Sequence, residues 1–345
     1  MKGLWKYLSP FSPDQSGASA VLYGLGGIVL VCDAGGCAGN ICGFDEPRWF
    51  KQKSAVFSAG LRDMDAILGR DDRLVDKLAL AVADVEADFA AIIGTPVPAV
   101  IATDYHGLRR LAEKRIHKPV IVIESTGMGY YDDGEEKAYK ELFKTFTQDE
   151  YICRKGVIGV LGLTPLDSIH PADIEAVKEC LQRNGYVDVR VYGEGGIEPI
   201  RVAGEAEKNL VLSPAGLKAA KYLQKKFGTP YEAAYPVGHD EESVCDNWQD
   251  KRVLIVHQQV AANALRERLE RHGATVCTAT WFKAPEELCR DGDVQLKEED
   301  DFIDMVESGG YDIIFADALF RRAVRNFSGT YVDFPHFAVS GRMDG

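Results

Sequence analysis

The stretch GIVLVCDAGGCAGNICGF, residues 27–44, joins a strand-length apolar run to a loop of glycines and cysteines. Residues 27–32 predict a buried strand, and this run is far too short to span a membrane. Cys32, Cys37 and Cys42 follow one another at intervals of five, which gathers three of the chain's eight cysteines. Because sites in open parallel sheets lie where strands end, this loop is the first candidate functional site.

Short apolar runs alternate with amphipathic segments over the rest of the chain. Further strands are predicted at residues 90–94, 120–124, 157–163, 188–192, 209–212, 253–257, 274–278 and 312–316. Helices are predicted between most of them, including residues 171–184, 214–227 and about 260–272. This alternation predicts an α/β fold of Rossmann-like units, in which parallel sheets are flanked by helices. Polar seams near residues 150 and 245 predict three domains, at 1–150, 151–245 and 246–345.

The charge balance limits the possible partners. The 345 residues include 40 Lys and Arg against 53 Asp and Glu, a net charge of −13. This charge argues against nucleic acid and against an anionic membrane surface as partners. The glycines at 24, 26 and 27 precede their strand, and no GxxxxGKS or GxxxxGKT motif occurs, so nucleotide-phosphate binding is not predicted. The first residues show no signal-peptide pattern, and we expect a cytoplasmic protein whose thiols stay reduced.

The chemistry of the cysteine loop has several interpretations. Glycines and alanines around Cys37 let an inorganic cluster approach the backbone, where amides can donate to its sulfides. The spacing matches neither a zinc ribbon nor a bacterial ferredoxin. An iron–sulfur site, a zinc site, a thiol switch and simple packing therefore all stay open. A chain that offers three ligands or fewer needs another from elsewhere, such as a second subunit.

The order of segments resembles the nitrogenase component 1 family, which includes dinitrogenase subunits, cofactor-maturation scaffolds and related reductases of chlorophyll synthesis. CDAGGC, residues 32–37, is similar to the family's HGPxGC motif and has Cys37 at the position of the cluster ligand. The resemblance continues through VFSAGLRDMDAILG (56–69), IIGTPVPAVIATD (92–104), NLVLSPAGLKAAKYLQKKFGTPY (209–231) and YDIIFADALFRRAVRNFSGTYVDFPHF (311–337).

The chain departs from the family pattern at several ligand positions. Thr95 stands where the family usually has its third cluster cysteine, and Cys32 replaces the histidine of HGPxGC. Ala220 stands where the catalytic subunit has its cofactor cysteine. The sequence also ends soon after FPHF, before the region that supplies the cofactor histidine. We therefore expect no molybdenum cofactor and no reduction of dinitrogen.

The resemblance implies three domains around a central cleft and an iron–sulfur cluster, 4Fe–4S or larger, at a subunit interface. The implied ligands are Cys37 of each chain, with Cys42 or Cys32 completing the set in a homodimer or a paralogous heterodimer. Low-potential electrons would come from a nitrogenase-reductase-like, ATP-dependent iron protein and would reduce a small-molecule substrate in the cleft. The alternatives are a non-catalytic scaffold or carrier for a cluster or cofactor precursor, and a degenerate member without a cluster that acts as a binding partner.

Other residues are weaker candidates. Asp45 is a possible oxygen ligand in place of a missing thiolate. His106 and His257 are possible contacts in the cleft, and each is alternatively a histidine satisfied by its surroundings. Glu46 and Arg48 could orient the loop or contact the partner, and a surface ion pair is the plainer interpretation. Trp49 and Phe50 are predicted to be core residues, with an electron-transfer relay as the alternative.

Overall fold

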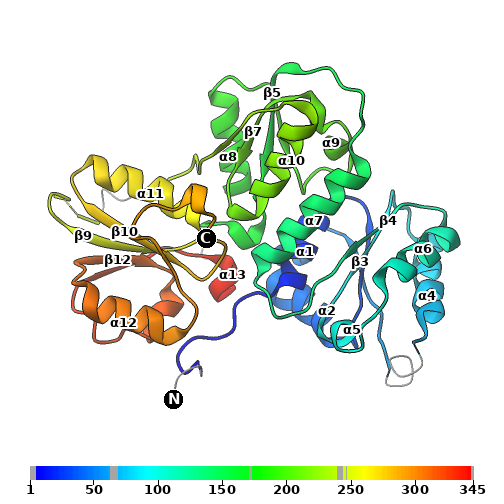
Figure 1. The fold of residues 1–345 in the computed structure, drawn as a ribbon, viewed down its shortest axis with the longest axis horizontal. Helices are drawn as coiled ribbons and strands as arrows, with labels where there is room; N and C mark the ends of the chain where they lie inside the picture. The colour runs from blue at the N-terminus through cyan, green and yellow to red at the C-terminus, as the bar shows by residue number, and fades with distance from the viewer. Residues whose placement is uncertain (1–4, 63–68, 171–172, 239–243, 246, 343–345) are drawn as a thin grey trace.

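The structure is a computed structural model that describes residues 5–62, 69–170, 173–238, 244–245 and 247–342. It contains three β-sheets, which occupy three lobes of the molecule (Figure 1), and all the strand pairs in them are parallel. The first sheet has the strand order β2 (Ala55–Ser58), β1 (Ile28–Val31), β3 (Ala90–Ile93) and β4 (Val120–Ile123). The second sheet has the order β6 (Asp188–Val191), β5 (Arg154–Leu161), β7 (Ala206–Val211) and β8 (Tyr231–Ala233). The third sheet has the order β11 (Val294–Gln295), β10 (Thr275–Thr280), β9 (Arg252–Val256), β12 (Ile313–Ala316) and β13 (Thr330–Asp333). The predicted α/β fold class is confirmed.

Helices cover the faces of these sheets. They are α1 (Asp14–Leu22), α2 (Gly36–Asn40), α4 (Asp71–Asp84), α5 (Pro96–Val100), α6 (Tyr105–Ile116), α7 (Tyr131–Phe146), α8 (Asp173–Arg183), α9 (Glu198–Arg201), α10 (Leu217–Phe227), α11 (Gln259–Arg271), α12 (Glu299–Gly309) and α13 (Phe337–Ser340). Shorter helical turns are η1 (Ile41–Asp45), η2 (Pro47–Phe50), η3 (Pro165–Asp167), η4 (Ala203–Glu205), η5 (Pro214–Gly216), η6 (Glu286–Leu288) and η7 (Ala318–Arg322). No helix in the described part of the chain is long and apolar enough to cross a membrane.

Each strand that the sequence predicts is present, with ends shifted by up to three residues. The strands it misses are β2, β8, β11 and β13, and each of them lies at the edge of its sheet. Edge strands are short and partly exposed here, so they lack the continuous apolar run that marks a strand buried on both faces. The predicted start of the helix at residues 171–172 lies outside the described residues.

The first and second sheets share one hydrophobic core. Helix α7 lies between them and contacts both α1 and α10. Its residue Phe143 meets Tyr192 of the second sheet with ring centroids 5.0 Å apart, in an edge-to-face arrangement. Because this core joins residues from both sides of the seam near residue 150, the predicted domain boundary there stays a prediction.

Helices α1 and α7 cross at backbone contact. A Cβ atom on Gly134 would lie 1.7 Å from the Asp14 carbonyl oxygen, and one on Gly17 would lie 1.8 Å from the Tyr131 carbonyl oxygen. Only glycine fits at these two positions, because both neighbouring atoms belong to the backbone and cannot move aside.

We predict that Gly134→Ala lowers the free energy of unfolding by at least about 3 kcal/mol, because the added methyl group forces the two helices apart. Gly39→Ala is the control, since a Cβ atom on Gly39 meets nothing within 4 Å. Urea denaturation of both variants and the parent measures the difference. Equal stability of the two variants would contradict the close crossing.

Candidate functional site

The cysteine stretch is organised by Asp33, which lies just after β1. One oxygen of the buried Asp33 carboxylate accepts the Ala38 N–H at 2.8 Å, and the other accepts the Ser58 hydroxyl at 2.5 Å. Gly35 has a φ of 117°, a left-handed conformation that glycine adopts without strain. The chain then turns into α2 and continues as the π-helix η1. The predicted loop is therefore largely helical.

Cys37 lies half-buried on α2, beside Thr95. Burial raises the pKa of the Cys37 thiol, Asp33 raises it further, and a hydrogen bond with the Thr95 side chain opposes the rise. The Thr95 hydroxyl also donates to the Cys32 carbonyl at 2.8 Å. Thr95 thus contacts both Cys37 and Cys32.

Cys32 and Cys42 have different surroundings from Cys37. Burial raises the pKa of Cys32 to about 12, so this thiol is protonated at neutral pH. Cys42 is half-buried on η1 near Glu46, and burial followed by the Glu46 charge raises its pKa. Cys37 lies on the α-helix α2, whereas Cys42 lies on the π-helix η1 that follows it. Among the residues that the structure describes, no three His, Cys, Asp or Glu side chains are grouped to hold a metal ion.

Asp45 joins the cysteine stretch to α1. Its two carboxylate oxygens accept the hydroxyls of Ser12 at 3.0 Å and Ser16 at 2.7 Å. Burial raises the pKa of Asp45, and the two serine hydrogen bonds limit the rise. A role as an oxygen ligand would require these hydrogen bonds to break, and it stays a prediction.

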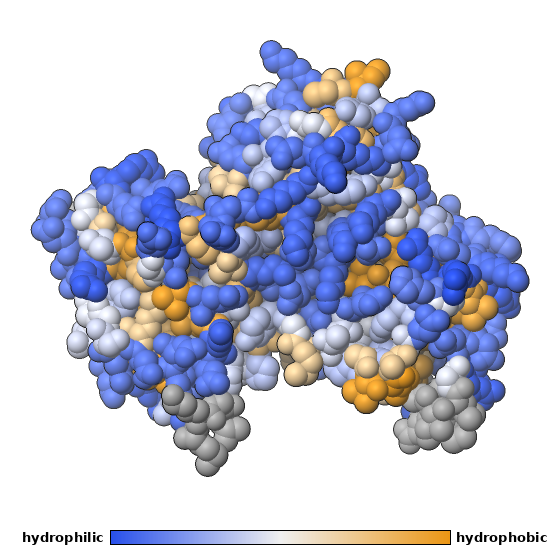
Figure 2. Space-filling view, viewed as in Figure 1, coloured by the Kyte–Doolittle hydropathy of each residue, from blue (hydrophilic) through white to orange (hydrophobic). Residues whose placement is uncertain are grey.

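Apolar side chains are exposed on the same edge of the first sheet. Phe44 is 74% exposed, Val100 is 85% exposed and Met128 is 88% exposed. Gly127 brings the Met128 segment against Pro96, which begins α5 beside Thr95. Figure 2 shows an apolar area over the region of α5, at the lower edge of the molecule. Exposed apolar patches of this kind are typical of interaction surfaces.

Trp49 and Phe50 are exposed, so our prediction that they are core residues is wrong. Arg48, which precedes these two residues in η2, faces inward. Its guanidinium contacts the buried Glu46 carboxylate at 2.7 Å and the Glu194 carboxylate at 2.5 Å. Burial alone would lower the pKa of Arg48, but the two carboxylates outweigh it and raise the pKa. The ion pair is therefore buried, not a surface pair, and it reaches the second sheet.

A cavity of about 140 Å³ lies where segments from all three sheets meet. It is lined by residues that follow β1, β5 and β13: Pro47, Arg48, Lys51, Pro165, Ser168, Ile169, His170, Ile174, Phe337 and Arg342. The carboxyl ends of parallel strands are the usual position of ligand sites in this fold class. None of the described residues that line it is acidic.

The two candidate histidines are not among the residues that line this cavity. His106 is exposed near the start of α6. His257 follows β9 and is buried, with its Nε2 atom 3.0 Å from the Pro335 carbonyl oxygen. Its ring stacks on His336 with centroids 4.2 Å apart, and burial lowers the pKa of His257 to about 4. His257 is therefore neutral at physiological pH, and a role for either histidine as a substrate contact stays a prediction.

The sequence analysis missed a buried polar cluster that adjoins His257. The Tyr131 hydroxyl lies 3.0 Å from His336 Nε2 and donates to Asp167 at 3.1 Å. Glu135 accepts the Thr164 hydroxyl at 2.6 Å and is hydrogen-bonded to Asp167, and burial raises the pKa of both carboxyl groups. Asp167 follows a predicted strand, but nothing local in the sequence indicates that these residues meet.

The chain is thus an α/β protein of three parallel sheets flanked by helices, with a cysteine-bearing helical turn after β1. The family model for nitrogenase component 1 type oxidoreductases matches residues 14–244, and the chain belongs to this family. Among solved structures, "Nitrogenase Cp1 at pH 6.5" has a TM-score of 0.75 and 14% identity, over 97% of this chain and 87% of that one. This second match supports the fold alone.

Similarity to individual proteins is partial. A nitrogenase iron-molybdenum cofactor biosynthesis protein, NifE of Clostridium pasteurianum, is 28% identical over 51% of this chain and 38% of its own length. One subunit of the light-independent protochlorophyllide reductase of Zygnema circumcarinatum is 35% identical over 27% of this chain and 18% of its own. The same subunit of the Nostoc punctiforme reductase is 20% identical over 62% of this chain and 44% of its own. The matched part thus spans less than half the length of each of these relatives.

We predict that Arg48→Ala lowers the free energy of unfolding by about 3–5 kcal/mol, because Glu46 is left buried without its counter-charge. Arg115→Ala is the control, since Arg115 and its partner Asp76 are both more than half exposed, and it should cost at most about 1 kcal/mol. Urea denaturation compares the two. A loss for Arg48→Ala no larger than the control's would show that the ion pair is not buried in solution.

We also predict that Asp132→Asn changes how stability depends on pH. Asp132 is buried, accepts the Lys283 N–H at 2.6 Å and has its pKa raised by burial to about 7. The folded chain therefore holds a proton that the unfolded chain releases near pH 4, so this residue makes stability fall as pH rises from about 4 to about 7.

An asparagine side chain does not titrate, so the Asp132→Asn variant lacks this loss of stability. The free energy of unfolding of the variant relative to the parent should therefore rise by up to about 4 kcal/mol between about pH 4 and about pH 7 and then level off. Urea denaturation at pH 5, 6, 7 and 8 measures the difference. A constant difference between variant and parent would show that Asp132 does not titrate in this way.

Proposed function

We propose that this protein is a nitrogenase-like iron–sulfur protein that takes low-potential electrons from an ATP-dependent, reductase-like iron protein and reduces a small substrate other than dinitrogen. The observation that carries the proposal is the position of Cys37. It lies half-buried on a glycine-rich helical turn, at the carboxyl end of a parallel strand, in a chain that belongs to the nitrogenase component 1 family.

The surroundings of Cys37 fit one edge of an inorganic cluster. Cβ atoms placed on Gly35, Gly36 and Gly39 would meet nothing within 4 Å, so the backbone of this turn is open to a bulky group. Removal of the thiol proton is the step that metal binding would have to drive, because burial raises the pKa of Cys37. A bound cluster would supply one-electron redox chemistry. The chain's own contribution is to present the thiolate and to shield it from water.

One chain offers Cys37 on this face, and further ligands must come from elsewhere. The exposed side chains of Phe44, Val100 and Met128 favour pairing with a second chain on the same edge. Two copies around a two-fold axis would bring two Cys37 thiolates together. We propose that Cys42 completes the set after a local rearrangement of η1, with Cys32 as the less accessible alternative.

The cavity at the junction of the three sheets is the proposed position of the substrate. Its lining combines cationic side chains with apolar ones, among them Arg48, Lys51 and Phe337. Arg48 is held in place by Glu46 and Glu194, so this wall is fixed before any ligand enters. Pockets for drug-sized ligands have volumes of roughly 300–1,000 Å³, so a cavity of about 140 Å³ favours a compact substrate.

The second candidate is a scaffold or carrier for a cluster or cofactor precursor. Similarity to a protein named for iron-molybdenum cofactor biosynthesis supports it. The two functions differ in turnover. A reductase's cluster is reduced by an iron protein with MgATP and reoxidised by substrate, whereas a carrier releases its cluster intact to an acceptor protein.

We predict that Cys37→Ser lowers the iron and sulfide bound per chain at least about tenfold after anaerobic isolation, because the interface loses a thiolate from each copy. Cys180→Ser is the control, since Cys180 lies on α8, a helix that packs beside the second sheet and not at the cysteine turn. Metal analysis and EPR of the dithionite-reduced protein measure the effect. Full iron content in Cys37→Ser, or an iron-free parent protein, would overturn the proposed site.

A further inference from the structure

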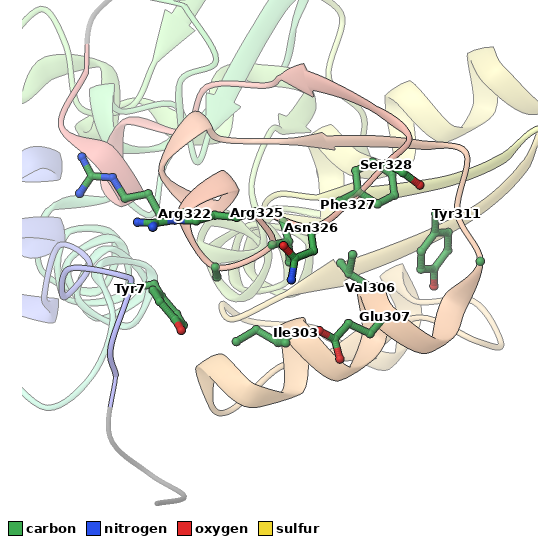
Figure 3. Close-up of a pocket in the computed structure, with 13 residues that line it drawn as sticks. Tyr7, Ile303, Val306, Glu307, Tyr311, Arg322, Arg325, Asn326, Phe327 and Ser328 are labelled. Atoms are coloured by element: carbon green, nitrogen blue, oxygen red, sulfur yellow. The ribbon is translucent and has the colours of Figure 1, made fainter.

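A second cavity lies on the third sheet, far along the chain from the cysteine turn. It has a volume of about 560 Å³, within the range of small-molecule sites. Figure 3 shows that Ile303, Val306 and Glu307 of α12 line one side, with Tyr311 at one end. The segment from Arg322 to Ser328 lines the other side, and Tyr7 closes the opposite end. None of these residues belongs to the site described above.

The arginines beside this cavity have no acidic partner in the described part of the chain. Arg321, Arg322 and Arg325 form no ion pair with any residue in the described ranges. In a chain with a net charge of −13, three arginines within five positions would be expected to attract carboxylates of their own. Arg325 instead lies over the Tyr7 ring, 6.0 Å from its centroid. Figure 3 shows Arg322 and Arg325 reaching toward the side where Tyr7 lies.

A buried carboxylate holds the segment that carries Tyr7, which forms one wall of the cavity. Glu299, at the start of α12, accepts the backbone N–H groups of Lys6, Tyr7 and Leu8 at 2.9–3.2 Å. Nearby, Trp5 and Phe11 join an aromatic cluster with Trp281. The segment that carries Tyr7 is therefore held against α12, so the cavity keeps its shape without a ligand.

The charges divide the cavity into two parts. Glu307 lies on the α12 side and disfavours an anion there. The guanidinium groups of Arg322 and Arg325 lie at the other end, with the side chain of Asn326 between them and α12. Val306, Phe327 and Tyr311 supply apolar surface along the rest of the wall.

We propose that this cavity binds a small molecule with a phosphate or carboxylate group at the arginine end and an apolar body against Val306 and Phe327. Arginine suits both anions because its planar guanidinium donates two parallel hydrogen bonds. The apolar body accounts for the length of the cavity beyond the arginines. This site is independent of the cluster and of the proposed reduction.

Isothermal titration with four probes tests the proposal on the full chain. Phenyl phosphate carries both parts, benzoate replaces the phosphate with a carboxylate, and inorganic phosphate and benzyl alcohol each carry one part. We expect one site per chain for phenyl phosphate or benzoate, at least about tenfold tighter than for either single-part probe. The better of the two identifies the anion. No saturable binding of either two-part probe would overturn the proposal.

Two double variants test whether binding depends on the arginines of this cavity or only on the net charge of the protein. Arg322→Gln with Arg325→Gln should weaken binding at least about tenfold, because both guanidinium groups are lost. Arg110→Gln with Arg115→Gln makes the same change in net charge on the exposed face of α6 and should leave binding unchanged. Circular dichroism confirms that both pairs fold. An equal loss in the two pairs, or no loss in the first, would overturn the proposed site.

Discussion

The buried ion pair between Arg48 and Glu46 is the interaction on which the site depends. Arg48 also reaches Glu194, in the turn after β6 of the second sheet, and the carbonyl oxygen of Ala20 in the last turn of α1. One side chain thus ties the segment after the cysteines to two other parts of the molecule. Because Arg48 faces inward, the neighbouring residues Trp49 and Phe50 are turned to the surface. The same side chain forms part of the wall of the junction cavity.

The three-sheet junction combines opposite kinds of buried titratable group. Burial lowers the pKa values of His257 and His336, which are neutral, and raises the pKa of Glu135 well above its usual value and that of Asp167 to about 6. Neutral side chains avoid the large cost of isolated charges in a region of low dielectric, and hydrogen bonds to Asp167 offset that cost for the one of these four groups that ionises near neutral pH. The polar groups then join the sheets through hydrogen bonds, as Tyr131 does between Asp167 and His336.

The sequence predicts the interior of the fold well and its periphery poorly. Interior strands such as β1, β3 and β12 are apolar along their whole length, so the sequence pattern predicts them, whereas the edge strands β2 and β13 are partly exposed and give no such pattern. The cysteine stretch is locally conspicuous, but its helical form depends on hydrogen bonds that Asp33 accepts, which composition does not indicate. The inward position of Arg48 could not be predicted, because its partner Glu194 is 146 residues away.

In the proposed dimer, the raised pKa of Cys37 would link cluster binding to association of the chains. Without metal, the half-buried thiol stays protonated, and the apolar residues around it remain exposed to water. Binding of a metal would replace the thiol proton, and pairing of two chains would cover Phe44, Val100 and Met128. Metal binding would relieve the half-buried, protonated thiol, and pairing would relieve the exposed apolar surface. Because a cluster held by Cys37 of both chains would require pairing, cluster loading and pairing would favour each other. A mononuclear metal bound to a single chain would gain neither the second thiolate nor the buried apolar surface.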